Sequence, residues 1–180
     1  MKSKLLLLIF PVLISCQGSE SKRTSNNQPH EQFLSDISLN SKVVINDITE
    51  IKRQPSDDIN LVTKYPLSKE KKEEYDKNGT LTNNSDISDS TIYKIISYNL
   101  INEKNEKVEI VEDGSSKSLQ KFALSDYNKL LYQNLGIKFK LNKKFETLKG
   151  SINIEFEISK TDRKEAKVPV NVSIHDKISE

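Results

Sequence analysis

Two stretches decide the fold: residues 151–158, SINIEFEI, and residues 166–174, AKVPVNVSI. In both, every second residue is apolar, which is the period of a strand with one face in a core and one in water. The polar residues 159–165 between them predict a hairpin loop. With Ile158 opposite Ala166, Glu157 would face Lys167 on the outer surface. Because Pro169 has no N–H to donate to a ladder, the second strand is expected at a sheet edge.

Outward from this hairpin, other short apolar runs predict further strands. Residues 91–101 are apolar on both faces, as a central strand would be, and a turn at 102–105 leads to a partner at 106–111. Shorter candidates are residues 43–45, 59–62 and 136–141. A helix is predicted over Ser125–Asn134, where Tyr127, Leu130 and Leu131 share a face and Gly136 follows, and a charged second helix over Ser68–Asp76, ending near Gly79.

These elements predict one mostly β domain over residues 37–180. Short strands joined as antiparallel hairpins, with one or two short helices, favour an antiparallel β-sandwich of immunoglobulin-like or transthyretin-like type. The 180 residues contain one Cys, which excludes a disulfide framework and a zinc site with two or more thiolates. The formal net charge of +2 gives no reason to expect a nucleic-acid partner, and no motif implies a cofactor.

The N-terminus carries a pattern for export. Lys2 and Lys4 precede an apolar run at 5–14, too short to span a bilayer. The run ends in Leu13-Ile14-Ser15-Cys16, which resembles the lipobox of bacterial lipoproteins, and the only Cys of the chain is the one that this motif requires. The resemblance implies removal of the signal peptide, residues 1–15, and diacylglycerol on the Cys16 sulfur. The alternative is an ordinary secreted protein with a free thiol.

The residues after Cys16 predict a tether between the membrane and the domain. Residues 16–36 begin with a long polar run, and such a segment buries too little apolar surface to offset the entropy of ordering. Gln17 stands where Asp marks inner-membrane retention in well-studied lipoproteins. By that resemblance, the expected location is the outer membrane, on a lipid anchor.

The chain contains few candidate catalytic or metal-binding residues, and we predict neither kind of site. His30 lies in the expected tether, and His175 lies next to Asp176 on the polar side of the last strand, where we interpret it as a surface residue. Three acidic pairs, Asp57-Asp58, Glu73-Glu74 and Glu112-Asp113, are interpreted as solvated loop charge. Residues around Gly79 resemble the middle of a calcium loop, but Ser85 occupies the position of its bidentate Glu, so a turn after a helix is the better interpretation.

Two features point to binding. The polar connection at 64–90 is longer than most in compact domains, and Tyr65, Tyr75 and Leu81 are its candidate partner-binding residues. The second feature is charge: residues 114–180 carry 13 Lys+Arg and 8 Asp+Glu, and the excess is concentrated in one region. A row of lysines there is a candidate site for an anionic glycan or lipid phosphate, or equally a protected edge strand: Lys138, Lys140, Lys143 and Lys144.

The leading hypothesis is a membrane-anchored envelope lipoprotein whose domain acts as a non-catalytic binding or structural module, with another envelope protein or an anionic glycan as partner. One alternative is an enzyme that acts on envelope polymers through dispersed carboxylates. Another is an inhibitor or immunity lipoprotein that blocks a target by loop insertion.

Overall fold

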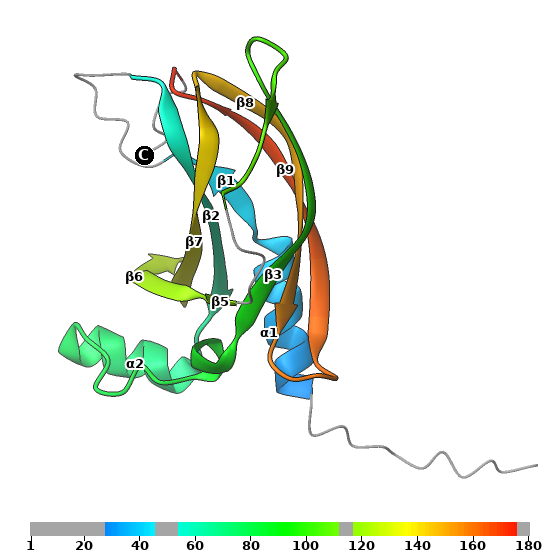
Figure 1. Ribbon diagram of the computed structural model, residues 1–180. Helices are drawn as coiled ribbons and strands as arrows, with labels where there is room; N and C mark the ends of the chain where they lie inside the picture. The colour runs from blue at the N-terminus through cyan, green and yellow to red at the C-terminus, as the bar shows by residue number, and fades with distance from the viewer. Residues whose placement is uncertain (1–27, 46–53, 112–116, 176–180) are drawn as a thin grey trace, which may run out of the picture.

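The computed structural model describes residues 28–45, 54–111 and 117–175. Nine strands within these ranges form two antiparallel sheets, which Figure 1 shows packed face to face around a shared interior. One sheet has the order β1-β2-β7-β6: β1 Lys42–Val44, β2 Ser56–Pro66, β7 Leu130–Phe145 and β6 Gln120–Tyr127. The other has the order β4-β3-β8-β9, with β5 also paired to β3: β4 Lys107–Val108, β3 Ile92–Asn102, β8 Thr147–Glu157, β9 Arg163–Ser173 and β5 Lys117–Ser118. The prediction of a mostly β, antiparallel sandwich is confirmed.

Strands β8 and β9 are the hairpin that the alternation predicts, but in a different register. Ile154 rather than Ile158 pairs with Ala166, so the connection shortens to residues 158–162 and Glu157 lies opposite Arg163. The shift is four positions, and an even shift keeps every apolar side chain on the core face. The shorter connection adds further ladder pairs to both strands. As predicted, the strand that carries Pro169 lies at the edge of its sheet.

Strand β3 lies between β8 and the short strands β4 and β5, so its central position is confirmed. Only one of its faces is in the core, however. Leu100 is fully buried, whereas Ile96 and Ile101 are exposed on the outer face. A register irregularity between Ile95 and Ser97 lets two residues of β3 span one position of β8.

The helix predicted over Ser125–Asn134 is wrong. The chain there forms a hairpin of β6 and β7, in which Tyr127 pairs with Leu130 across a two-residue turn. Both turn residues, Asn128 and Lys129, have positive φ, as a type I′ turn requires. Strand β7 also pairs with β2 along most of its length, and this long ladder outweighs a local helical pattern of three apolar residues.

A first helix, α1 at Gln28–Leu39, was not predicted, and residues 28–36 therefore do not belong to a tether. Its apolar residues Phe33, Leu34 and Ile37 are buried against the sandwich. The Phe33 ring meets the Tyr65 ring edge-on at 4.7 Å, and the Thr63 hydroxyl donates to the Ile37 carbonyl at 2.5 Å. Burial of this face, rather than helix propensity, stabilises the segment.

The interior of the sandwich is filled by large apolar side chains from both sheets. The largest that are fully buried include Phe139 and Phe145 from β7 and Phe156 from β8. Tyr93 meets Phe139 edge-on between the sheets, with 6.2 Å between ring centroids. The alternating apolar residues of β8 and β9, such as Ile154 and Val168, point into this core.

Candidate functional site

The connection between β2 and β3 is an ordered structure rather than a loop. Helix α2 spans Lys69–Asn78, which confirms the charged helix predicted from the sequence. The Ser68 side chain accepts a hydrogen bond from the Lys71 N–H, and Gly79 ends the helix in the left-handed conformation at φ 70°. A short 3-10 helix, η1 at Ile87–Ser90, follows and leads into β3.

The Asp86 carboxylate is the centre of a polar network under this connection. Its Oδ2 accepts a hydrogen bond from the Tyr65 hydroxyl at 2.6 Å, and its Oδ1 accepts from the Ser88 N–H and hydroxyl at 3.0 Å and 2.6 Å. Lys71 and Lys121 contribute ion pairs at 3.4 Å and 3.3 Å. One carboxylate thus joins β2, α2, η1 and β6.

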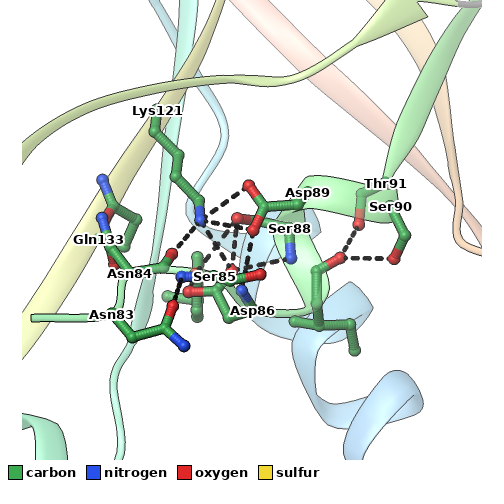
Figure 2. A network of polar contacts seen from close by, with 12 residues as sticks. Asn83, Asn84, Ser85, Asp86, Ser88, Asp89, Ser90, Thr91, Lys121 and Gln133 are labelled. Carbon is green, nitrogen blue, oxygen red and sulfur yellow. Dashed lines mark hydrogen bonds and ion pairs between the residues drawn. The ribbon is translucent and has the colours of Figure 1, made fainter.

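Lys121 extends the network on its other side. Figure 2 shows it reaching toward Asp86, Asp89 and Asn84. Its Nζ lies 2.8 Å from the Asp89 carboxylate and donates to the Asn84 carbonyl. The Asn84 side chain in turn donates to the buried Gln133 of β7 at 2.9 Å. The segment before β3 is therefore tied to two strands of the opposite sheet.

The environment of Asp86 lowers its pKa to about 2. Burial is the largest single influence and raises the pKa, but the hydrogen bonds from Ser88 and Tyr65, together with the charge of Lys121, outweigh it. For Tyr65, burial and the bond to Asp86 raise the pKa well above its ordinary value. The network is built around an ionised carboxylate and a neutral phenol.

The network has a structural role: it holds elements in place. Ser88 is buried, and its hydroxyl donates a hydrogen bond to the Asp86 carboxylate. The Lys121 ammonium is paired with the carboxylates of Asp86 and Asp89. A nucleophile needs a neighbouring base that can take its proton, and the carboxylate beside Ser88 is a weak one, because the pKa of Asp86 is lowered to about 2. The network holds α2 and η1 against the β6–β7 hairpin.

Beside α2 and η1 lies a surface that we name the aromatic face. It consists of the exposed Phe122, Tyr127 and Leu130 together with the half-buried Tyr132 and Lys64. Inward residues of β7 such as Leu131 and Leu135 are buried, so the alternate residues Leu130 and Tyr132 point outward. Tyr127 is 61% exposed and Leu130 46%. Exposed apolar side chains gathered in one place typically mark an interaction site.

Lys64 packs on the tyrosines of this face. Its Nζ lies 4.6 Å from the centre of the Tyr132 ring and 5.6 Å from that of Tyr127. These distances allow attraction between the ammonium and the negative face of each ring. The lysine thus contacts both rings from the neighbouring strand β2, and the aromatic face carries a positive charge beside its two tyrosines.

At the far end of the face, Phe122 covers Gly136. A Cβ at position 136 would lie 2.2 Å from the Phe122 ring. We expect Gly136→Ala to lower the free energy of unfolding by about 1 kcal/mol, because the ring must leave the strand it covers. Chemical denaturation followed by circular dichroism measures this change. In a Phe122→Ala background the same substitution should cost clearly less, and an equal cost in both backgrounds would contradict the packing described here.

Of the three residues predicted to bind a partner, none is a free loop residue. Tyr65 lies in β2, is buried, and donates to Asp86. Tyr75, in α2, and Leu81, after it, are partly buried against the core. They fasten the connection to the domain, and the exposed side chains lie next to it on the β6–β7 hairpin.

Of the lysines predicted to bind anions, Lys138 and Lys140 lie on a strand as expected, and β7 also includes Lys143 and Lys144. Three of the four have acidic partners. Lys138 is 3.2 Å from Asp58, and Lys140 is 2.7 Å from Asp57 on the neighbouring strand β2. Lys143 is 3.4 Å from Glu106. The bond to Lys140 lowers the pKa of Asp57. Lys144 is exposed at the end of the row, so the positive charge available for an outside anion is much smaller than the sequence suggests.

The two histidines lie at opposite ends of the described chain. His30 is in the first turn of α1, and its Nδ1 lies 2.8 Å from the Asp162 carboxylate in the β8–β9 turn, a contact that lowers the pKa of Asp162. His175 is exposed, as expected for a surface residue, and its Nε2 lies 3.6 Å from Glu146. Asp176, its predicted neighbour, lies outside the described residues.

The acidic pairs that the structure describes form ion pairs and hydrogen bonds that stabilise the fold. Glu73 pairs with Lys69 on α2, and Glu74 accepts the Thr82 N–H at 2.6 Å. With Gly79 capping the helix, the turn interpretation of the calcium-like residues is confirmed. Glu112 and Asp113 lie outside the described residues, as does Cys16. Among residues 28–45, 54–111 and 117–175, no group of three or more His, Cys, Asp or Glu side chains could hold a metal ion.

A cavity of about 160 Å³ opens between the sheets at Tyr93, Gln120 and Ile137, and its charged lining residues are Lys117 and Lys138. No carboxylate lines this cavity. It therefore lacks the facing acid pair on which the hypothesis of a polymer-cleaving enzyme depends.

Sequence reasoning missed both the Asp86 network and the aromatic face. The face was hidden by the helix predicted over Ser125–Asn134, which places Tyr132 on a different side from Tyr127 and Leu130. A signal was present, because the alternation at 137, 139 and 141 continues backward through Leu135 and Leu131. The network joins residues far apart in the chain, and no spacing indicates it.

No helix in the described part of the chain is long and apolar enough to cross a membrane. Comparison of the chain with protein-family models, with curated proteins and with solved structures finds no match.

Proposed function

We propose that the protein is a lipid-anchored binding module of the bacterial cell envelope, held at the outer membrane through diacylglycerol on Cys16. The anchor is supported by the basic residues Lys2 and Lys4, the apolar run at 5–14, and a lipobox-like Leu13-Ile14-Ser15-Cys16 that contains the only Cys of the chain. Two or more acyl chains at one residue give stable attachment, which a single chain does not.

The observation that carries the binding role is the aromatic face beside a rigidly held segment. A binding surface functions best when it is ordered before it meets its partner, because less entropy is lost on association. Here Lys64 contacts the rings of Tyr127 and Tyr132, and Lys72 of α2 pairs at 2.9 Å with Asp126 in the same hairpin. The polar side chains of the Asp86 network are engaged in holding α2 and η1 beside the face, which favours binding over catalysis.

Replacing the lipidated residue tests the anchor. In Cys16→Ala, incorporation of labelled palmitate into the protein should be abolished, and the protein should leave the membrane fraction, because the alanine has no sulfur to carry lipid. Ser15→Ala is the matched control and should be labelled normally, because the lipobox requires only a small residue there. Persistent labelling of Cys16→Ala would refute the proposed anchor.

A further inference from the structure

We infer that the aromatic face rests on the lipid bilayer to which the chain is anchored, with Tyr127 and Leu130 at the depth of the headgroups. This inference rests on the proposed function, because it takes Cys16 as the point of attachment. It names the bilayer itself as the envelope component that the module contacts.

The first support is the position of the face relative to the anchored end of the chain. Helix α1 begins at Gln28, and its first turn is tied to the β8–β9 turn by the 2.8 Å contact of His30 with Asp162. The next turn of α1 packs through Phe33 on Tyr65, near the end of β2, where the ladder reaches Tyr132. The start of α1 and the β6–β7 turn therefore lie toward the same end of the sandwich, as Figure 1 shows.

The second support is the length of chain between the lipid and the domain. Residues 16–27 number twelve, and twelve residues span at most about 40 Å even when fully extended. This end of the domain is therefore held close to the membrane. Because the short connection keeps the domain at a high effective concentration beside the membrane, a weak contact is enough to orient it.

The third support is the chemistry of the face. Tyrosine is enriched where membrane meets water, because its ring is apolar and its hydroxyl stays hydrated. Leu130 adds a side chain that is 46% exposed, and Lys64 and Lys129 place ammonium groups where lipid phosphates would lie. Asp126, the acid next to Tyr127, is paired with Lys72 at 2.9 Å and so opposes anionic lipid less. The amide nitrogen of the outward-facing Asn134 already donates two hydrogen bonds within the sheet, so it has no donor left for a glycan partner.

The test uses the absence of Trp from the chain and the presence of a single Cys. The mature chain, residues 16–180, is coupled through the Cys16 thiol to a maleimide phospholipid in vesicles of phosphatidylethanolamine and phosphatidylglycerol. One variant carries Leu130→Trp, and the control carries Ile96→Trp. Ile96 lies on the other sheet and is likewise 46% exposed, so the two probes begin in matched environments.

We expect the tryptophan of the Leu130→Trp variant to shift its emission to shorter wavelength on the vesicles and to be quenched by brominated acyl chains. The tryptophan of the Ile96→Trp variant should do neither. Adding Tyr127→Ser and Lys129→Ser should lower vesicle binding of the uncoupled chain by about tenfold or more, since a buried aromatic side chain and a phosphate contact are lost.

An unchanged emission in the Leu130→Trp variant, or equal quenching of both probes, would overturn the inference. So would a shift caused by soluble peptidoglycan fragments in place of vesicles, which would make the face a glycan site. Chemical coupling makes these outcomes independent of lipidation in the cell. The bilayer contact can therefore fail while Cys16 remains the anchor, and labelling of Cys16→Ala can refute the anchor without changing the vesicle result.

Discussion

Replacing Gly150 with alanine is expected to lower the free energy of unfolding by about 3 kcal/mol or more. Gly150 lies in β8, paired with Leu100 of β3 on one side and Val170 of β9 on the other. Its φ is 138°, a conformation that L residues rarely adopt, and a Cβ there would lie 1.8 Å from the Asn99 carbonyl oxygen. The obstacle is backbone within a central ladder, so it cannot move without separating β3 from β8.

Gly79→Ala is the matched control for the Gly150 substitution. Gly79 also has positive φ, at 70°, but no atom lies within 4 Å of the position of its Cβ. Alanine there should cost about 1 kcal/mol, the conformational part alone. Urea denaturation followed by circular dichroism gives both values. If Gly150→Ala proved no more destabilising than Gly79→Ala, the close approach of β3 to β8 would be refuted.

The substitution Asp86→Asn is expected to lower the free energy of unfolding by about 2 kcal/mol near neutral pH. The carboxylate accepts bonds from Tyr65 and Ser88 and pairs with Lys71 and Lys121, and its side chain is only 14% exposed. An amide keeps the shape but loses the charge, and it turns a donor toward groups that are themselves donors. Asp126→Asn is the control: that acid is half-exposed, and its substitution should cost less than about 1 kcal/mol.

The Asp86→Asn variant also tests how the free energy of unfolding depends on pH. The pKa of Asp86 falls from 3.8 to about 2 on folding, so its contribution is present above pH 4 and is lost as the pH falls toward 2. A shift of this size corresponds to about 2 kcal/mol. The stability difference between the natural protein and Asp86→Asn should therefore shrink between about pH 4 and pH 2. A difference that stayed constant across this range would show that the charge of Asp86 is not what the network requires.

Sequence patterns located most strands because the alternation of apolar and polar residues depends only on residues close together in the chain. The hairpin of β8 and β9 follows from side chains two residues apart, and α2 follows from Ser68 and Gly79 at its ends. The same local reasoning failed over Ser125–Asn134, where three apolar residues fit a helix. There the chain pairs with β2, sixty and more residues earlier, and turns at Asn128 and Lys129 instead.

By itself the sequence determined the antiparallel, mostly β character of the domain, its edge strand at Pro169 and the charged helix α2 ending near Gly79, because each depends on residues close together in the chain. Only the tertiary structure decided the register of β8 on β9, the pairing of Lys138 and Lys140 with Asp58 and Asp57, and the network around Asp86. It also placed Phe122, Tyr127, Leu130 and Tyr132 together on one face. Ion pairs and ring contacts depend on distances in space. Those distances are set only when strands that are far apart in the chain come together in the sheets.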